Sequence, residues 1–262
     1  MKLAAIQLSI SDADSPSDRL AMVDRAVATE AESGAGVVLL PEMWLPGYFG
    51  FDGYDGVAED LDGGPTATRL AALARQNSVY LCAGSLVERR GDKMFNTTLL
   101  FDPEGARVGA YRKIHLFGYG SREQDLLTPG QDVVTVDLAG CRVGLSTCYD
   151  LRFPELYREQ VDQGAEMFLI VAGWPFPRVD AWRCLLQARA IENQAFIVAC
   201  NSAGRQMGST FAGASAAFDP WGVCLGSLDH RPGVLRLDLR IEDASDARAE
   251  FPALADRRLG GS

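Results

Sequence analysis

The chain has 262 residues, of which 47% are hydrophobic and 23% charged, a balance typical of a globular protein with a sizeable core. A formal net charge of −10 disfavours nucleic acid or an anionic membrane as a partner, because both attract clustered lysine and arginine. The six cysteines show no C-x-x-C spacing and only two histidines are present, so we expect no metal site and no cofactor.

The first residues contain no apolar run of signal-peptide length, and no segment of the chain reaches the length that spans a bilayer. We therefore expect a soluble protein in the reducing cytoplasm. No stretch of linker composition divides the sequence, which predicts one domain over residues 1–262. The charged segment 242–262 is predicted to be a C-terminal tail that leaves the domain body and packs on a partner subunit.

The first part of the chain reads as strand, helix and strand. Residues 3–8 form a short apolar run, and apolar residues then recur at helical spacing as far as residue 34. Residues 37–40 are continuously apolar, as expected for a strand covered on both faces, and Glu42 follows them. The aromatic and glycine-rich segment 43–64 is long for a connection, which favours a functional loop.

A helix is predicted to open at Pro65, and strand-like stretches with turns between them follow at residues 79–88, 94–101 and 107–112. A polar loop over residues 115–130 leads to a strand at 133–138. The next strand ends near Leu145 and is followed by Cys148 and a run of charged and aromatic residues.

Cys148 is predicted to lie at a strand-to-helix elbow, because Pro154 suits the first turn of a helix. We expect an exposed sulfur close to a helix N-terminus, where the pKa of a thiol is lowered. The alternative is a buried, inert cysteine, the usual state of a free thiol.

The last third of the chain predicts a strand at 167–171, a helix at 179–194 and strands at 195–200, 213–218, 223–227 and 234–239. Helices that alternate with strands, mixed with hairpins, favour a layered α/β domain. A simple Rossmann fold is disfavoured, because no G-x-G-x-x-G follows a strand and opens a helix.

Three chemically active residues share one context, at or just after the end of a strand: Glu42, Lys113 and Cys148. A carboxylate can take the proton of a thiol, and an ammonium group can stabilise the oxyanion that forms when a thiolate attacks a carbonyl or nitrile carbon. Each charged residue alone could instead form a surface salt bridge. Their occurrence together favours catalysis.

The segments P-E-M-W-L-P-G-Y, Y-R-K-I-H-L-F and C-Y-D-L-R-F-P-E-L resemble the three signature blocks of the nitrilase superfamily, the carbon–nitrogen hydrolases with a Glu-Lys-Cys triad. The similarity extends to A-R-A-I-E-N-Q and D-P-W-G, so it covers nearly the whole chain. It implies a four-layer αββα sandwich and a homodimer in which two sandwiches join.

The resemblance also implies a mechanism and further site residues. Glu42 would take the proton of Cys148, and Lys113 with the backbone N–H of Tyr149 would hold the tetrahedral oxyanion. Glu42 would then protonate the departing ammonia and activate the water that hydrolyses the thioester. The family has a second glutamate after the lysine, for which Glu123 is the best match and Asp125 a competitor.

Aromatic residues near these blocks are candidates for the pocket walls, since ligand pockets are mainly apolar. They are Tyr48, Phe49, His115, Phe117 and Trp174. Tyr149, whose backbone N–H would contact the substrate oxyanion, is a further substrate-binding residue. Any of these side chains could instead belong to the core. Asp150, Arg152 and Glu155 are predicted to brace the elbow, with contact to an anionic substrate as the alternative for Arg152.

The predicted function is hydrolysis of a small linear amide with release of ammonia, as in an ω-amidase or a deaminated-glutathione-type (Nit-like) amidase. The alternatives within the family are an N-carbamoyl amino acid hydrolase and a nitrilase. Outside hydrolysis, they are acyl transfer from the thioester and a non-catalytic binding protein. One departure bears on the substrate: many ω-amidase-like relatives carry a histidine where this chain has Ala181, before Trp182.

Overall fold

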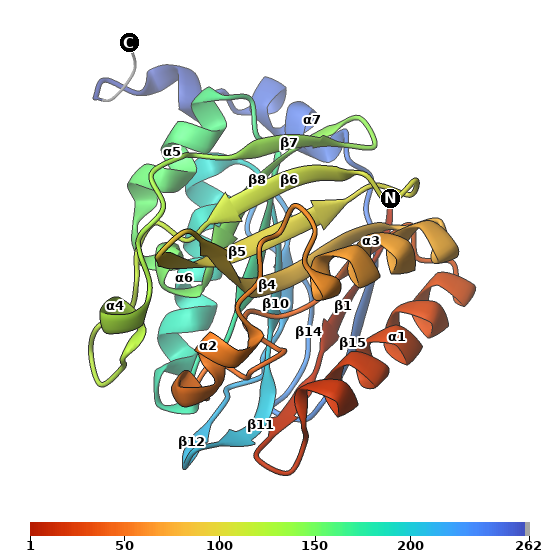
Figure 1. Ribbon diagram of the computed structural model, residues 1–262. Coiled ribbons are helices and arrows are strands. Elements are labelled where there is room, and N and C mark those ends of the chain that lie inside the picture. The colour runs from red at the N-terminus through yellow and green to blue at the C-terminus, as the bar shows by residue number, and fades with distance from the viewer. Residues whose placement is uncertain (260–262) are drawn as a thin grey trace.

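The structure is a computed structural model in which residues 1–259 are described. Two six-stranded sheets pack face to face and helices cover both outer faces (Figure 1). The first sheet carries α1 (Pro16–Glu32) and α3 (Pro65–Asn77), and the second carries α5 (Pro154–Asp162) and α6 (Val179–Asn193). The predicted αββα sandwich is confirmed.

The first sheet has the order β15-β1-β3-β4-β5-β6. Its strands are β1 (Lys2–Gln7), β3 (Val37–Leu39), β4 (Tyr80–Arg90), β5 (Lys93–Phe101), β6 (Arg107–Arg112) and β15 (Gly233–Asp238). The second sheet has the order β14-β13-β10-β9-β8-β7. Its strands are β7 (Thr135–Leu138), β8 (Cys141–Thr147), β9 (Met167–Ala172), β10 (Phe196–Asn201), β13 (Ala216–Phe218) and β14 (Cys224–Ser227).

A third, small sheet was not predicted. It joins β2 (Ser9–Ser11), β11 (Ala203–Gln206) and β12 (Ser209–Thr210). The remaining helical segments are short: α2 (Tyr54–Val57), α4 (Glu123–Leu126), α7 (Asp243–Glu250) and the 3-10 turns η1 (Phe51–Gly53), η2 (Cys148–Arg152), η3 (Phe176–Arg178) and η4 (Ala253–Asp256). The predicted loop 43–64 therefore contains two of these short segments, η1 and α2.

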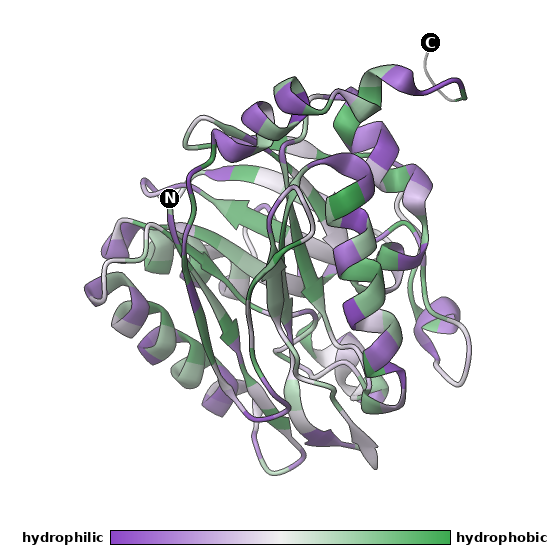
Figure 2. Cartoon of the chain, turned by 180° about the vertical axis from the view of Figure 1, so that it is seen from behind, coloured by the Kyte–Doolittle hydropathy of each residue, from purple (hydrophilic) through white to green (hydrophobic). Residues whose placement is uncertain are grey.

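The two faces of β3 show why the chain forms layers. Val37 and Leu39 belong to the core between the sheets, whereas Val38 and Leu40 belong to the core under the helices of the first sheet. Successive side chains of a strand point to opposite faces, so a continuously apolar run serves both cores. Figure 2 shows the result as hydrophobic strands inside and helices whose hydrophilic residues face outward.

Strand direction brings several strand ends together. β3 and β4 are parallel, as are β8, β9 and β10, while β6 regains the direction of β4 after two antiparallel pairings. Because the carboxyl ends of parallel strands lie at one edge of a sheet, the segments after β3, β6, β8 and β9 meet at one end of the sandwich.

The C-terminal segment requires a correction. Residues 243–250 form α7, in which Ala244 and Ala247 are buried, instead of leaving the domain body. Arg248 donates hydrogen bonds to the carbonyls of Ala165 (2.7 Å) and Gln194 (3.1 Å), which fasten α7 to the second sheet's side of the sandwich. Within residues 1–259, no helix has both the length and the apolar character needed to cross a membrane.

Candidate active site

Cys148 is the first residue of η2, at the sharp turn that directly follows β8. Its φ of 51° lies in the left-handed region that non-glycine residues rarely adopt, so the surrounding contacts must hold the strain. The backbone N–H of Thr147 donates to Asp150 Oδ2 (3.0 Å), and the hydroxyls of Thr147 and Thr98 lie 2.9 Å apart. Pro154 begins α5, as predicted.

The predicted exposure of the Cys148 sulfur is wrong. The residue is only 6% exposed. Burial raises the pKa of the thiol well above its usual value, and the nearby carboxylate of Glu42 raises it further, whereas Lys113 opposes them. The Cys148 side chain is therefore a neutral thiol at rest. The charged residues that follow it in sequence do not expose it, because Asp150 among them is itself fully buried.

Lys113 joins two carboxylates in a fully buried cluster. Its Nζ lies 2.8 Å from Glu42 Oε1 and 2.9 Å from both carboxylate oxygens of Glu123, and all three side chains are inaccessible to solvent. The structure thus brings Glu123 to the lysine. Asp125, the competing candidate, is exposed on α4.

Asn96 and two backbone N–H groups also donate hydrogen bonds to the two carboxylates. Asn96 Nδ2 donates to Glu42 Oε1 (2.8 Å) and Glu123 Oε1 (3.0 Å). Gly173 N donates to Glu42 Oε2 (2.7 Å), and Phe117 N donates to Glu123 Oε2 (2.7 Å). Asn96 was not predicted as a site residue. Its only signal was a polar residue inside a predicted strand.

The charges of the cluster depend on one another. Burial raises the pKa of Glu42, and Lys113 counteracts part of this effect. Burial alone would lower the pKa of Lys113, but the carboxylates of Glu123 and Glu42 outweigh it, so the pKa of the amine is raised well above its usual value. Lys113 therefore remains an ammonium group between two acids.

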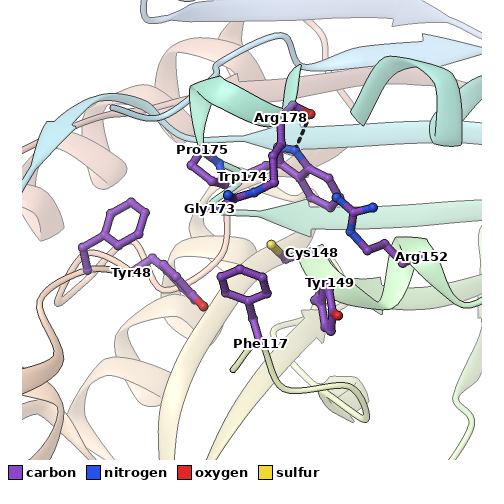
Figure 3. Close-up of a pocket in the computed structure, with 10 residues that line it drawn as sticks. Tyr48, Phe117, Cys148, Tyr149, Arg152, Gly173, Trp174, Pro175 and Arg178 are labelled. Carbon is purple, nitrogen blue, oxygen red and sulfur yellow. Dashed lines mark hydrogen bonds between the residues drawn. The ribbon is translucent and has the colours of Figure 1, made fainter. Parts of the chain in front are cut away.

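A small cavity lies above Cys148. Its lining residues are Tyr48, Phe49, Phe117, Cys148, Tyr149, Arg152, Gly173, Trp174, Pro175 and Arg178. Figure 3 shows the sulfur between the aromatic rings of Phe117 and Trp174, and a hydrogen bond from Trp174 Nε1 to the carbonyl of Arg178 (2.8 Å). Its walls are mainly aromatic, as is usual for ligand pockets.

Two arginines flank the cavity. The guanidinium of Arg152 lies 5.0 Å from the ring centre of Trp174, and that of Arg178 lies 5.3 Å from the ring centre of Phe117. Within residues 1–259, neither guanidinium has a carboxylate partner. Arg178 was not predicted as a site residue, because it becomes a candidate only once the turn after β9 is known to reach the cavity.

His115, a predicted pocket residue, lies outside the set of residues that line this cavity. Its ring stacks on Phe153, with ring centres 3.7 Å apart and planes at 8°, and its Nδ1 lies 2.8 Å from Asp150 Oδ1. The other predicted wall residues do line the cavity: Tyr48, Phe49, Phe117, Tyr149 and Trp174.

The comparisons with known proteins agree with this geometry. The family model described as carbon-nitrogen hydrolase matches residues 2–249. A 2-oxoglutaramate amidase of Paenarthrobacter nicotinovorans is 36% identical, over 98% of this chain and 90% of its own length. The CN-hydrolase superfamily protein XC1258 of Xanthomonas campestris, solved with an arsenic adduct in its active site, is 30% identical with a TM-score of 0.90, over 100% of this chain and 98% of its own.

A third relative bears on the nucleophile. A glutamate-to-glutamine mutant of an amidase from Nesterenkonia, solved with the acetamide moiety of fluoroacetamide added covalently at its active-site cysteine, is 30% identical with a TM-score of 0.84, over 96% of this chain and 95% of its own. The chain belongs to the carbon–nitrogen hydrolase family of the nitrilase superfamily. It is a cysteine-dependent amidase, which hydrolyses a carbon–nitrogen bond other than a peptide bond.

Proposed function

We propose that Cys148 is the nucleophile of this amidase and Glu42 its general base. The observation that carries the proposal is the buried cluster in which a neutral thiol lies beside Glu42, itself paired with Lys113. Glu42 accepts the thiol proton as sulfur forms a bond to the amide carbon. The carbon–nitrogen bond then breaks, the proton passes from Glu42 to the leaving nitrogen, and ammonia departs from a thioester.

Lys113 and the backbone N–H of Tyr149 stabilise the oxyanion in this scheme. Preorganised donors in a site without water are among the strongest contributions to catalysis, since they need no reorganisation when the charge develops. In the second half of the reaction Glu42 takes a proton from water, whose oxygen attacks the thioester. The carbon–sulfur bond breaks, and the proton returns to Cys148.

Glu123 would act by positioning Lys113. It accepts hydrogen bonds from Nζ at both oxygens, and a further one from the hydroxyl of Tyr48 at 3.2 Å. With these bonds Glu123 fixes the ammonium group at the point where the oxyanion forms.

The substrate is proposed to be a short amide that carries a carboxylate at its other end. Arg152 and Arg178 have no carboxylate partner within residues 1–259, and they support an anionic substrate, because guanidinium groups bind carboxylates with two parallel hydrogen bonds. A relative named 2-oxoglutaramate amidase supports the same class of substrate. Tyr48, Tyr149 and Trp174 would form the walls around the chain between the two ends.

Ammonia release from a substrate panel tests both parts of this proposal. Cys148→Ala should abolish release from every substrate while the protein stays folded. Among wild-type reactions, ω-amides of dicarboxylic acids should exceed uncharged amides of equal length, and carbamoyl compounds and nitriles should react poorly. Arg178→Gln should raise KM for the acidic amides alone, with the exposed Arg205→Gln as control. Full activity of Cys148→Ala would refute the nucleophile, and equal turnover of charged and uncharged amides would refute the substrate class.

We further propose that the protein, as a single domain, forms a homodimer. Large apolar side chains are exposed together around the C-terminal end of α6: Ile191, Trp221, Val223 and Phe251. The rings of Trp221 and Phe251 have centres 6.4 Å apart, and Gly222 lies against Ile191. Contiguous exposed apolar surface of this kind marks interfaces. Ile191→Glu should convert a dimer to a monomer in light scattering, and a monomeric wild type would contradict the proposal.

A reducing compartment, the cytoplasm, is proposed for this protein. All six cysteines are free, and free thiols persist where glutathione and thioredoxin keep them reduced. Cell fractionation followed by detection of the protein would test this location.

A further inference from the structure

One buried carboxylate connects the two halves of the proposed oxyanion hole. Asp150 is fully buried and accepts four hydrogen bonds. Its Oδ2 accepts from the Tyr111 hydroxyl (2.7 Å) and from Thr147 N (3.0 Å). Its Oδ1 accepts from His115 N (2.9 Å) and lies 2.8 Å from His115 Nδ1.

The partners of Asp150 come from both segments that carry the oxyanion donors. Tyr111 and His115 lie two residues before and two residues after Lys113, so the segment that carries the ammonium group is fastened on both sides. Tyr149, whose N–H is the other proposed donor, directly precedes Asp150. The first segment follows a strand of the first sheet, whereas the second follows a strand of the second sheet.

The His115 ring is held firmly although it is not fully buried. Its side chain is 29% exposed, yet it lies against Phe153 on one face and bonds to Asp150 at its edge. The Tyr111 hydroxyl also accepts a hydrogen bond from Ile114 N (3.3 Å). The short turn between Tyr111 and His115 therefore has little freedom to move relative to Asp150.

We propose that Asp150, Tyr111 and His115 are positioning residues that set the distance between Lys113 Nζ and the N–H of Tyr149. Lys113 and Tyr149 come from different sheets, and Asp150 spans the gap between their segments. Oxyanion stabilisation depends on donor geometry at the scale of a few tenths of an ångström, so a loosened link lowers the rate without preventing substrate binding. This inference rests on the proposed function, because it concerns the same oxyanion.

A comparison of two reactions of Cys148 tests the inference. Amide hydrolysis passes through the oxyanion, whereas alkylation by iodoacetamide does not: sulfur bonds to the CH₂ carbon, the carbon–iodine bond breaks, iodide leaves, and the thiol proton goes to Glu42. Tyr111→Phe removes the hydroxyl that donates to Asp150 and accepts from Ile114 N, and His115→Ala removes the ring contact to Asp150. Both variants keep the backbone hydrogen bonds that Asp150 accepts. The exposed His230→Ala is the control.

Both variants should lower kcat for amide hydrolysis by roughly 10-fold. This decrease is smaller than the ~10²–10³-fold decrease in kcat that follows deletion of an oxyanion donor. KM and the alkylation rate should stay within about 3-fold of wild type. This pattern is expected when a variant weakens only the stabilisation of the transition state. Alkylation that falls in parallel with kcat would show that the residues support the elbow or the thiol and would overturn the inference. An unchanged kcat would overturn it as well.

The result is separable from a failure of the proposed function. If Cys148→Ala retains ammonia release, the proposed mechanism fails, whatever the two variants do. If Cys148→Ala is inactive while Tyr111→Phe and His115→Ala keep full kcat, the mechanism stands and only the positioning role is lost.

Discussion

Replacement of Lys113 by methionine isolates the electrostatics of the buried cluster. Lys113 Nζ lies 2.8 Å from Glu42 and 2.9 Å from Glu123, and no solvent reaches any of the three. Methionine has a similar length without the charge. Lys113→Met therefore leaves two carboxylates that share the Asn96 amide but have no cation between them.

Loss of one partner from a buried ion pair costs about 3–5 kcal/mol, because the remaining charge is buried without compensation. For a chain of this size each kcal/mol lowers Tm by about 2–4 °C, so we expect a decrease of roughly 6–20 °C. The variant should recover stability at acidic pH. Without Lys113, burial raises the pKa of Glu42 further above its value in the unfolded chain. Between the unfolded and the native pKa, the native state then binds more protons than the unfolded state, so the free energy of unfolding falls as pH rises.

Addition of Glu123→Gln to Lys113→Met gives the decisive comparison. The second substitution removes one of the two facing charges and should restore at least half of the lost free energy of unfolding, because the penalty comes from the uncompensated pair. Ammonia release should remain low, since the oxyanion donor is still missing. Lys93→Met, which removes an exposed lysine of β5, should change stability by less than about 0.5 kcal/mol.

Urea denaturation followed by tryptophan fluorescence measures these differences between pH 5 and 8. A loss below about 1 kcal/mol for Lys113→Met, the median range of an exposed pair, would refute the view that the lysine compensates two buried carboxylates. A double variant less stable than the single one would refute it too.

Three further outcomes follow from the geometry. Gly84→Ala should cost several-fold in activity and clearly lower Tm, because Gly84 has φ of 67° and an added Cβ would lie 2.0 Å from the carbonyl oxygen of Pro41, next to Glu42. Gly173→Ala should impair activity, measured as kcat/KM, more strongly than stability, measured as Tm. The added Cβ would lie 2.9 Å from Tyr48, beside the hydrogen bond that the N–H of residue 173 donates to Glu42. The acid limb of kcat/KM should have a midpoint above 4.5, because burial raises the pKa of Glu42 and the base acts only when ionised.

The layers of the fold were predictable because apolar periodicity is a local property of the sequence. Residues 37–40 and 167–171 read directly as strands covered on both faces, and both lie in the sandwich. The small sheet of β2, β11 and β12 escaped prediction. Its strands are only two to four residues long and mostly polar. They are defined by backbone pairing between distant segments, and no local sequence pattern marks them as strands.

The site was predictable as far as its residues stand at strand ends within recognisable blocks. Glu42, Lys113 and Cys148 satisfy that condition. Asn96 does not, because its importance depends on β5 lying beside β6 so that its amide reaches both carboxylates. The exposure of Cys148 was misjudged for a related reason: the polar residues after it turn inward to partners such as Tyr111, which lies far away in sequence.

The raised pKa of Cys148 is compatible with catalysis once charge is followed through the proposed reaction. At rest the cluster holds one cation, Lys113, two carboxylates, Glu42 and Glu123, and a neutral thiol. During attack the thiol proton neutralises Glu42 while the negative charge moves to the substrate oxygen beside Lys113. The buried site keeps the same net charge throughout. A preformed thiolate would instead add a third anion to a site without solvent, which is costly, so proton transfer coupled to attack is the path that this arrangement favours.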